Sequence, residues 1–423
     1  MMPTITLPYG RATLSAALPE PYRADLISLA PQPAVADPVG VVTATLDNLL
    51  GDAAWGDFAG ARSVAIAIND KTRPVPHHYL LPPLLRKLES LGLPPAAIRL
   101  IIATGTHAPM PPAEFTAVLP PEILARYPVL CHDADDAANL VHLGTTGQGT
   151  PVWINRAYLE AELRLVVGNI EPHQFQGFSG GVKSAAIGLA GRATVNHNHA
   201  MMTHPAAALG RYRDNPARQD VEEIGQMIGV QLALNAILND EKGIVRVLAG
   251  APGAVMAAGI PLAQAICQAT VNGRYDLVIA SPGGHPKDIN LYQAQKGLAH
   301  ASLIVRDGGV VILAAACPEG TGSRGYEQWV QGMASHQAVL ARFAQEGFRV
   351  GPHKAFQIAR DAVRLKVLLV SEMAPASVRR LLLTPVASLQ EGVNTAVAQL
   401  PPNPRIALMP KANGTIPLLV GNG

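Results

Sequence analysis

The sequence predicts an α/β fold of two domains, each built on a mostly parallel, doubly wound sheet. Apolar runs recur that are continuous rather than alternating, and each leads through a turn into a longer stretch with helical periodicity. Strands that are apolar at every position are buried on both faces, which is typical of a parallel sheet covered by helices. The runs occupy residues 63–70, 98–107, 163–173, 275–286, 308–320 and 367–372.

Length and composition support this expectation of two large cores. The chain has 423 residues, more than one small core accommodates. Hydrophobic residues make up 48% and charged residues 15%, and the net charge is only +2 without a basic stripe. Nucleic-acid binding needs clustered cations, so we expect a small-molecule ligand instead.

The sequence gives no sign of export or of membrane insertion. The first residues lack the basic start and long apolar core of a signal peptide, and runs such as 310–317 fall short of the roughly 20 residues that span a bilayer. Cys131, Cys267 and Cys317 lie far apart without CxxC spacing, which favours buried reduced thiols. We expect a cytoplasmic protein that contacts no membrane.

A domain boundary is expected near residue 270. A helix-like stretch there gives way to Asn272-Gly273-Arg274 and a new strand at Tyr275. This predicts an N-terminal catalytic and cofactor-binding domain, 1–270, and a C-terminal α/β domain, 274–405. The tail, 406–423, has the pattern of a strand with a turn-rich end that can return to the first domain.

Polar side chains follow the apolar runs at the point where each run ends. One strand-end histidine is most often structural, but several residues of similar chemistry favour function. Ligands of open α/β sheets bind outside the carboxyl ends of the strands, so we expect a shared site. The residues are Asp70, Arg73, His107, Glu171, His173, His285 and Glu319.

The stretch NDKTRPVP (69–76) begins at a strand end and makes a turn fixed by two prolines. This turn would hold the planar guanidinium of Arg73 so that it clamps a carboxylate or phosphate. Asp70 would orient the arginine or accept a ligand hydroxyl. A plain Asp70–Arg73 pair that ties the turn is an equally good interpretation.

In GNIEPHQFQGFSGGVK (168–183), Pro172 restricts the preceding residue to an extended geometry and presents His173 at a strand end. The FSGGVK turn resembles a phosphate nest that ends in Lys183, but it matches neither GxxxxGK[ST] nor GxGxxG. Conventional nucleotide binding is weakly supported, and a phosphorylated cofactor of another kind remains open.

The stretch RATVNHNHAMMTHP (192–205) predicts a helix start that carries His197 and His199. Residues two apart on a helix point roughly 200° away from each other, so only one of the two faces a given ligand. Without Cys ligands or HExxH, a closed zinc site is not expected. One imidazole bound to a metal that another group mostly holds is chemically reasonable.

Together these motifs resemble the nickel-dependent lactate racemase family, whose members are 2-hydroxyacid racemases and epimerases. The resemblance rests on DxTRPxP from Asp70, GTH before an acidic residue, EPHxxxGFSGGxK and TxxxNH, and it returns at SPGGHPKDINLYQAQKG (281–297). The chain departs from the pattern at SAAIGLAG (184–191), where the family commonly has a proline before the glycine. That departure concerns only the local shape of the loop.

The resemblance implies a nickel-pincer nucleotide, a pyridinium-3-thioamide-5-thiocarboxylic acid mononucleotide, joined covalently to Lys183. It implies His199 as the nickel ligand. The remaining cofactor-binding residues that it implies are Asp70, Thr72, Phe178, Ser179, Gly180 and Gly181.

The implied reaction interconverts configurations at the carbinol carbon of lactate or a related 2-hydroxy acid by transient hydride transfer to the cofactor. His107 and His173 would be the two acid/base groups, and Arg73 would bind the carboxylate. Tyr292, Gln293 and Lys296 of the second domain would close the site in an interdomain cleft. A dicarboxylate such as malate would need a further cation from Lys71, His285, Lys287 or Arg324.

Two other functions stay open at this point. A zinc-type hydrolase would use the same histidines with Glu114 or Glu171 as general base. A non-enzymatic phosphometabolite-binding or cofactor-binding protein would use only the FSGGVK turn. For the racemase, we also expect transient contact with the enzymes that make its cofactor.

Overall fold

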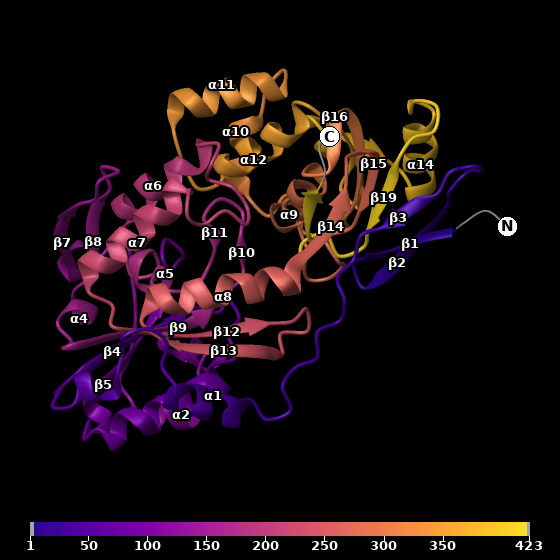
Figure 1. Ribbon diagram of the computed structural model, residues 1–423. Coiled ribbons are helices and arrows are strands. Elements are labelled where there is room, and N and C mark those ends of the chain that lie inside the picture. Colours follow the sequence, from indigo (N-terminus) through magenta and orange to yellow (C-terminus); the bar gives the residue numbers. More distant parts are fainter. Residues whose placement is uncertain (1–3, 421–423) are drawn as a thin grey trace. The chain divides into compact units, whose positions relative to one another are not determined.

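The computed structural model describes residues 4–420 and divides into two compact units (Figure 1). The central unit is Pro31–Ile266, and the terminal unit combines the other described residues, 4–30 and 267–420. Each unit has its own six-stranded sheet. The expected α/β class with parallel sheets is confirmed, apart from one antiparallel edge pair in the central unit.

The sheet of the central unit has the order β13-β12-β9-β4-β5-β6, and only β13 runs antiparallel to its neighbour. Nearly every residue of its inner strands is buried, as the continuous apolar runs predict. The strands are β4 (Val64–Asn69), β5 (Ile98–Ala103), β6 (Val129–Cys131), β9 (Leu163–Asn169), β12 (Leu232–Leu238) and β13 (Ile244–Gly250).

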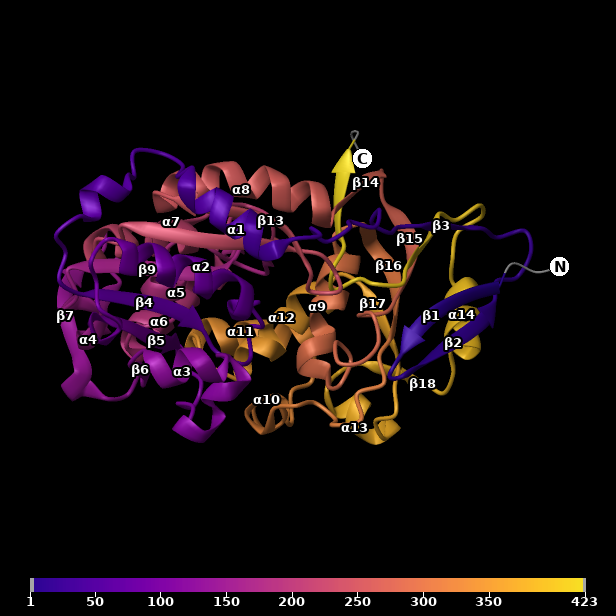
Figure 2. The same cartoon turned by 90° about the horizontal axis from the view of Figure 1, so that it is seen from below.

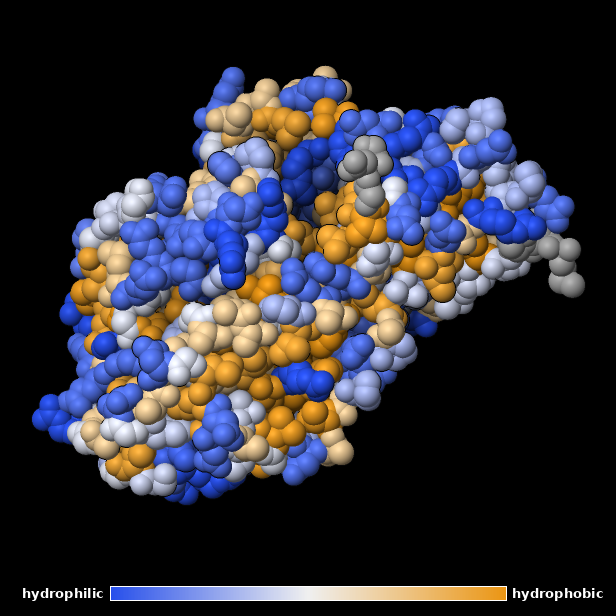
Figure 3. Space-filling view, in the orientation of Figure 1, coloured by the Kyte–Doolittle hydropathy of each residue, from blue (hydrophilic) through white to orange (hydrophobic). Residues whose placement is uncertain are grey.

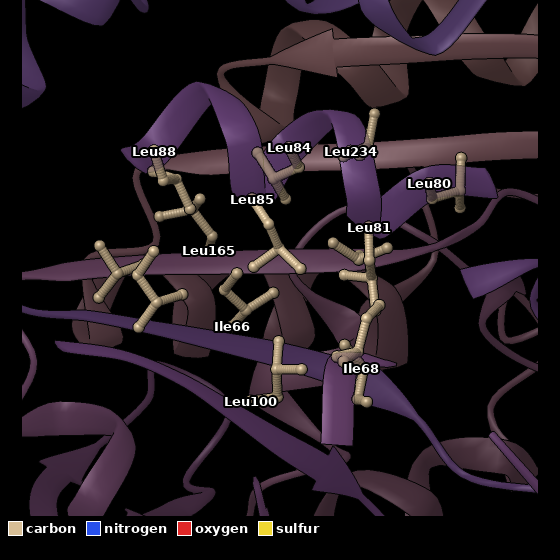
Figure 4. Close-up of a cluster of buried hydrophobic side chains, with 14 of the residues drawn as sticks. Ile66, Ile68, Leu80, Leu81, Leu84, Leu85, Leu88, Leu100, Leu165 and Leu234 are labelled. Atoms are coloured by element: carbon tan, nitrogen blue, oxygen red, sulfur yellow. The ribbon is translucent and has the colours of Figure 1, made fainter. Parts of the chain in front are cut away.

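One face of this sheet is covered by α1 (Pro38–Asp47) and α2 (His77–Ser90). The leucines of α2 recur every three or four residues, so they form one stripe that points at the sheet (Figure 4). They pack on Ile66, Ile68, Leu100, Leu165 and Leu234, all fully buried. Each such side chain contributes roughly 1.5–3 kcal/mol by leaving water, so this layer holds the strand ends in place.

The opposite face is covered by the helices that follow β8 in the chain, and its core contains several alanines. These helices are α4 (Arg156–Leu159), α5 (Lys183–Ala186), α6 (Arg192–Ala200), α7 (Pro216–Ile228) and α8 (Pro252–Cys267). Two antiparallel hairpins, β7 (Leu140–Thr145) with β8 (Pro151–Asn155) and β10 (Pro172–His173) with β11 (Gly177–Phe178), and α3 (Pro121–Arg126) complete the unit. Part of the surface over α8 is formed by apolar residues (Figure 3).

The terminal unit has a wholly parallel main sheet in the order β18-β17-β16-β15-β19-β3 (Figure 2). Its strands are β3 (Ala24–Leu26), β15 (Tyr275–Ala280), β16 (Val305–Ala314), β17 (Lys366–Val370), β18 (Thr384–Val386) and β19 (Ile406–Met409). Its helices are α9 (Leu291–Ser302), α10 (Arg324–Val330), α11 (His336–Glu346), α12 (Pro352–Ala362), α13 (Pro375–Arg380) and α14 (Leu389–Val397).

The division between the units differs from the expected 1–270 and 274–405. Residues 4–30 belong to the terminal unit, where β3 pairs with β19 and so satisfies that strand's open edge. The hairpin of β1 (Thr4–Tyr9) and β2 (Ala12–Ala17) is held by Gln390 of α14, whose amide bonds both backbone groups of Ala17. A three-residue edge strand has no clear sequence pattern, which is why this pairing was not predicted.

The tail also differs from the expectation that 406–423 can rejoin the first domain. Within its described part, β20 (Ile416–Val420) pairs in parallel with β14 (Gln268–Asn272), and β19 lies inside the terminal sheet. Both strands therefore belong to the terminal unit.

The three cysteines are free thiols, and of the expected buried positions Cys267 and Cys317 are buried whereas Cys131 is partly exposed. Over residues 4–420, no helix combines the length and apolarity that crossing a bilayer requires.

Candidate active site

A pocket lies where three neighbouring strands of the central sheet end. Strands β9, β4 and β5 are adjacent and parallel, so their carboxyl ends meet at one edge. All residues that line the pocket belong to the central unit. Its polar lining is Asn69, Asp70, Arg73, Thr104, Thr106, His107, Asn169, Glu171, His173, Ser179, Lys183, Ser184 and His199.

Asp70 and His107 form a hydrogen-bonded pair at the end of β4 and β5. Asp70 is 3% exposed, and its Oδ2 lies 2.8 Å from Nδ1 of His107. Its Oδ1 accepts from the Thr72 amide at 3.1 Å and from the Thr72 hydroxyl at 2.7 Å. Burial alone would raise the pKa of Asp70, but the hydrogen bonds from His107 and Thr72 outweigh burial and lower it. Asp70 is therefore a buried carboxylate that orients an exposed imidazole.

The turn after β4 presents Arg73 to the pocket. The Arg73 amide donates to the Asp70 carbonyl at 3.1 Å, and the Arg73 side chain is exposed. The side chain of Asp70 pairs with Thr72 and His107, so an Asp70–Arg73 ion pair is not what ties the turn. Lys71 points to Glu114, with Nζ and Oε2 2.5 Å apart.

His173 stands at the start of the small β10–β11 hairpin. Its Nδ1 accepts from the Gln176 amide at 3.2 Å, and a backbone N–H can only donate. The neutral ring therefore carries its hydrogen on Nε2. Phe175 packs edge-on against His173 at 4.8 Å and against His199 at 4.9 Å between ring centroids, so one buried phenyl ring contacts both imidazoles.

Arg218 holds the FSGG turn in place through hydrogen bonds to its backbone carbonyls. This arginine is fully buried, and its guanidinium donates to the carbonyls of Phe178 at 2.9 Å and Gly180 at 3.1 Å. Gly180 has φ +93°, and a Cβ there would lie 2.7 Å from Ile170, so only glycine fits. Glu222 pairs with the same guanidinium and balances its charge.

The predicted cofactor-binding residues separate into two groups. Asp70, Ser179, Gly180 and Lys183 line the pocket. Phe178 lies fully buried in the apolar core, and Thr72 and Gly181 are not among the residues that line the pocket.

Lys183 begins the short helix α5 and lines the pocket. Desolvation, followed by the positive charges of Arg73 and Arg218, holds its pKa well below the usual 10.5, and Glu171 acts in the opposite direction. This environment favours the uncharged amine of Lys183 over the ammonium form. Such an amine is a nucleophile that can form a covalent bond to a carbonyl or thiocarbonyl group.

Of the two histidines on α6, His199 faces the pocket and His197 does not. Nδ1 of His199 lies 3.2 Å from Oδ1 of Asn198, and the ring lines the pocket. His197 is exposed, and its Nδ1 lies 2.8 Å from the Thr150 hydroxyl. Within residues 4–420 no three His, Cys, Asp or Glu side chains are grouped to hold a metal ion. A metal at His199 would thus take most of its ligands from a bound group.

Tyr292, Gln293 and Lys296 belong to the first turns of α9 in the terminal unit. Asn290 caps this helix by accepting from the Gln293 amide at 3.1 Å, and Nζ of Lys296 donates to Oε1 of Gln293 at 3.1 Å. All three side chains are partly exposed. Their role in binding a substrate stays a prediction.

Several pocket residues were not predicted from the sequence. Asn69 accepts from the Ser184 hydroxyl at 2.8 Å, and the buried Asn169 lines the pocket beside them. Asn69 and Asn169 each end a β-strand, so the rule that placed Asp70 and His173 also points to them. The buried Arg218 lies in a helix and carries no comparable signal.

Comparison with known proteins agrees with the site. A model of the lactate racemase N-terminal domain matches residues 9–210, and a model of the lactate racemase C-terminal domain matches 270–416. The chain is 30% identical over 419 residues to the lactate racemase of Thermoanaerobacterium thermosaccharolyticum, covering 97% of this chain and 98% of that one. It is 32% identical over 330 residues to the lactate racemase of Lactiplantibacillus plantarum, covering 77% of each.

Solved structures give the same result. The lactate racemase apoprotein of T. thermosaccharolyticum superposes with a TM-score of 0.90 at 28% identity, over 98% of this chain and all of that one. A protein of Thermotoga maritima matches with a TM-score of 0.65 at 17% identity, over 90% of this chain and 97% of that one, which shows the fold alone. The zinc-hydrolase and non-enzymatic interpretations are therefore set aside, and the chain belongs to the lactate racemase family of isomerases.

Proposed function

We propose that the protein racemises a small 2-hydroxy monocarboxylic acid by hydride transfer to a nickel-pincer nucleotide bound in this pocket. The observation that carries the proposal is that Arg73, His107, His173, Lys183 and His199 all line one pocket. An acid/base pair, a carboxylate clamp, a tether and a metal ligand are the groups that this chemistry requires.

Lys183 is the proposed tether of the cofactor. Its lowered pKa supports this role, because only the uncharged amine can form the thioamide. When bound, the nickel-pincer nucleotide would supply an acceptor that takes a hydride and returns it. Gly180 and Ser179 would lie against it, and His199 would be the single protein ligand of the nickel.

Arg73 is the proposed carboxylate clamp. Among the described residues, Arg73 and Lys183 are the only Arg or Lys side chains that line the pocket. If Lys183 is bonded covalently to the cofactor and carries no charge, Arg73 is the remaining cation that can bind one carboxylate in a bidentate pair. Lys71 forms an ion pair with Glu114, so it does not add a second cation for a second carboxylate. This pocket therefore favours a lactate-like acid over a dicarboxylate such as malate.

His107 and His173 are the proposed proton-transfer groups. They follow β5 and β9, which lie on opposite sides of β4 and its Arg73 turn. Nδ1 of His107 donates to Asp70, which leaves Nε2 as a proton acceptor, whereas Nε2 of His173 carries the hydrogen. We assign the first removal of the substrate's hydroxyl proton to His107.

The test is an assay of purified holoenzyme, with nickel and intact mass determined on the same sample. Short, acidic, aromatic and sugar-derived 2-hydroxy acids are supplied as single enantiomers. The proposal predicts bound nickel and conversion of a short monocarboxylic member to its mirror image. A fully loaded sample that converts none of them would refute the substrate class.

A further inference from the structure

A network of buried polar side chains in the central unit ends at His199. It joins the turn between β7 and β8, the β10–β11 hairpin, and helices α6 and α7, which pack together (Figure 1). Its members are all buried and do not line the pocket, so they contact the site only through its histidines. They are Thr146, Thr150, Gln176, Asn198 and Asp220.

Asp220 of α7 is fully buried and anchors this network. Its Oδ1 accepts from the Thr146 hydroxyl at 2.5 Å, and its Oδ2 accepts from the Thr150 hydroxyl and from Nδ2 of Asn198, both at 2.9 Å. Burying a carboxylate is costly unless hydrogen bonds compensate for the lost water, and these three donors are neutral. A carboxylate buried at this cost outside the pocket points to a role in holding Asn198.

The two ends of the Asn198 amide are assigned by their contacts. One end faces two acceptors, the Ala217 carbonyl at 2.8 Å and the Asp220 carboxylate, so it is the NH₂ group. The other end is the oxygen, which can only accept. It accepts from Nε2 of the fully buried Gln176 at 2.7 Å and lies 3.2 Å from Nδ1 of His199. The neutral ring of His199 therefore carries its hydrogen on Nδ1 and its lone pair on Nε2.

We infer that Asn198, held by Asp220, is a positioning residue that fixes this tautomer of His199 and so makes Nε2 the nitrogen that binds nickel. A histidine that binds a metal through one nitrogen is oriented, and made more basic, when the other nitrogen donates to an oxygen. This inference rests on the proposed function, in which His199 is the nickel ligand.

The same network gives His173 the opposite tautomer. The backbone amide of Gln176 donates to Nδ1 of His173, and the side chain of Gln176 donates to Asn198. One buried residue thus connects a proton-transfer group, with hydrogen on Nε2, to a metal ligand with its lone pair on Nε2. The two imidazoles are prepared for different chemistry.

The first test uses apoprotein and needs neither cofactor nor activity. In ¹⁵N NMR of histidine-labelled protein at about pH 8.5, the signal that is absent from His199→Ala should show hydrogen on Nδ1 and none on Nε2. Asn198→Leu removes the acceptor, so this signal should no longer show the Nδ1–H tautomer alone. Asn198→Asp keeps an oxygen there and should keep the tautomer. Hydrogen on Nε2 of His199 in the wild type would overturn the inference.

The second test measures how firmly loaded protein holds nickel against EDTA, with the covalent adduct confirmed by intact mass. Asn198→Leu should lower the apparent nickel affinity about 10- to 100-fold, and Asn198→Asp should recover most of it. Glu223→Gln is the matched control on α7. Glu223 accepts from the Gly147 amide at 2.8 Å, in the same turn as Thr146 and Thr150, and its replacement should leave nickel retention unchanged.

Equal retention in Asn198→Leu and wild type, no recovery in Asn198→Asp, or an equal loss in Glu223→Gln would each overturn the inference. Thermal unfolding of every variant identifies a loss of fold, and the tautomer in wild-type apoprotein decides the matter if Asn198→Leu does not fold. A wild type without nickel or racemisation would instead refute the proposed function, and the two failures are thereby distinguished.

Discussion

The carboxylate of Asp70 lies 2.8 Å from Nδ1 of His107, on the side of the ring away from its free Nε2. Because Asp70 is buried and its pKa is lowered, it is ionised at neutral pH and accepts from Nδ1. This contact fixes the tautomer in which Nε2 of His107 can accept a proton. The pair therefore explains how a half-exposed histidine is made a base.

Replacing Asp70 by Asn should lower kcat by about 10²- to 10⁴-fold. An amide can donate to Nδ1, which favours the tautomer with hydrogen on Nε2 and removes the acceptor. Steady-state racemisation with nickel content as a check measures the effect. Glu114→Gln, which breaks only the Lys71 pair nearby, should stay within about twofold of wild type. A fully active Asp70→Asn variant would remove Asp70 from this role.

His107→Gln and His173→Gln should each reduce racemisation about 10²- to 10⁴-fold while nickel and the covalent adduct are retained. The two enantiomers have equal free energies, so each substitution must lower kcat/KM by the same factor in both directions of the racemisation. Chiral chromatography from each pure enantiomer measures the two rates. If either variant keeps wild-type rates, that histidine is not a proton-transfer group.

Lys183→Met should abolish the covalent adduct in intact-mass analysis and should stabilise the apoprotein near pH 7. The folded pKa of Lys183 lies well below 10.5, so between these two values the unfolded chain binds more protons, and wild-type stability rises with pH. The gain in the variant should be larger at pH 7 than at higher pH and should shrink as the pH rises towards 10.5.

Urea unfolding of wild-type and Lys183→Met apoprotein at several pH values measures this gain. Lys71→Met, at an exposed and ion-paired lysine, is the control and should keep the adduct. A gain that does not change with pH would show that Lys183 titrates normally. An adduct of equal mass on Lys183→Met would exclude it as the tether.

His199→Ala should lose nickel while it keeps the Lys183 adduct, because the metal and the tether are held by different side chains. His197→Ala should keep both, since His197 contacts Thr150 and not the pocket. Metal analysis and intact mass of the two proteins, purified in parallel, make the comparison. Equal nickel in both variants would argue that His199 is not the ligand.

Much of the central site follows from the sequence. Continuous apolar runs predict parallel strands, and the carboxyl ends of parallel strands lie at one edge of the sheet. This rule predicts that Arg73, His107 and His173 lie close together, and all three line the pocket. The roughly 200° between His197 and His199 likewise shows that only one of them faces the pocket, and the structure selects His199.

Other features depend on contacts between residues far apart in the chain. Asp70 pairs with His107 only because β4 lies beside β5. The hydrogen bonds from Arg218 to the carbonyls of the FSGG turn join residues that are 40 or 38 positions apart. The three-residue β3 joins a sheet whose other strands begin at Tyr275. Local patterns carry no information on such pairings, so these features had to come from the structure.

In the proposed mechanism, the hydrogen on the carbinol carbon moves as a hydride and returns to the same molecule. The direct measurement is racemisation of one enantiomer of the best 2-hydroxy acid by loaded enzyme in D₂O, followed by mass spectrometry of the mirror-image product. Hydride transfer predicts a product that carries ordinary hydrogen on the carbinol carbon, since a held hydride does not exchange with solvent. A product with deuterium at that carbon would show that a proton is removed there, and would exclude hydride transfer.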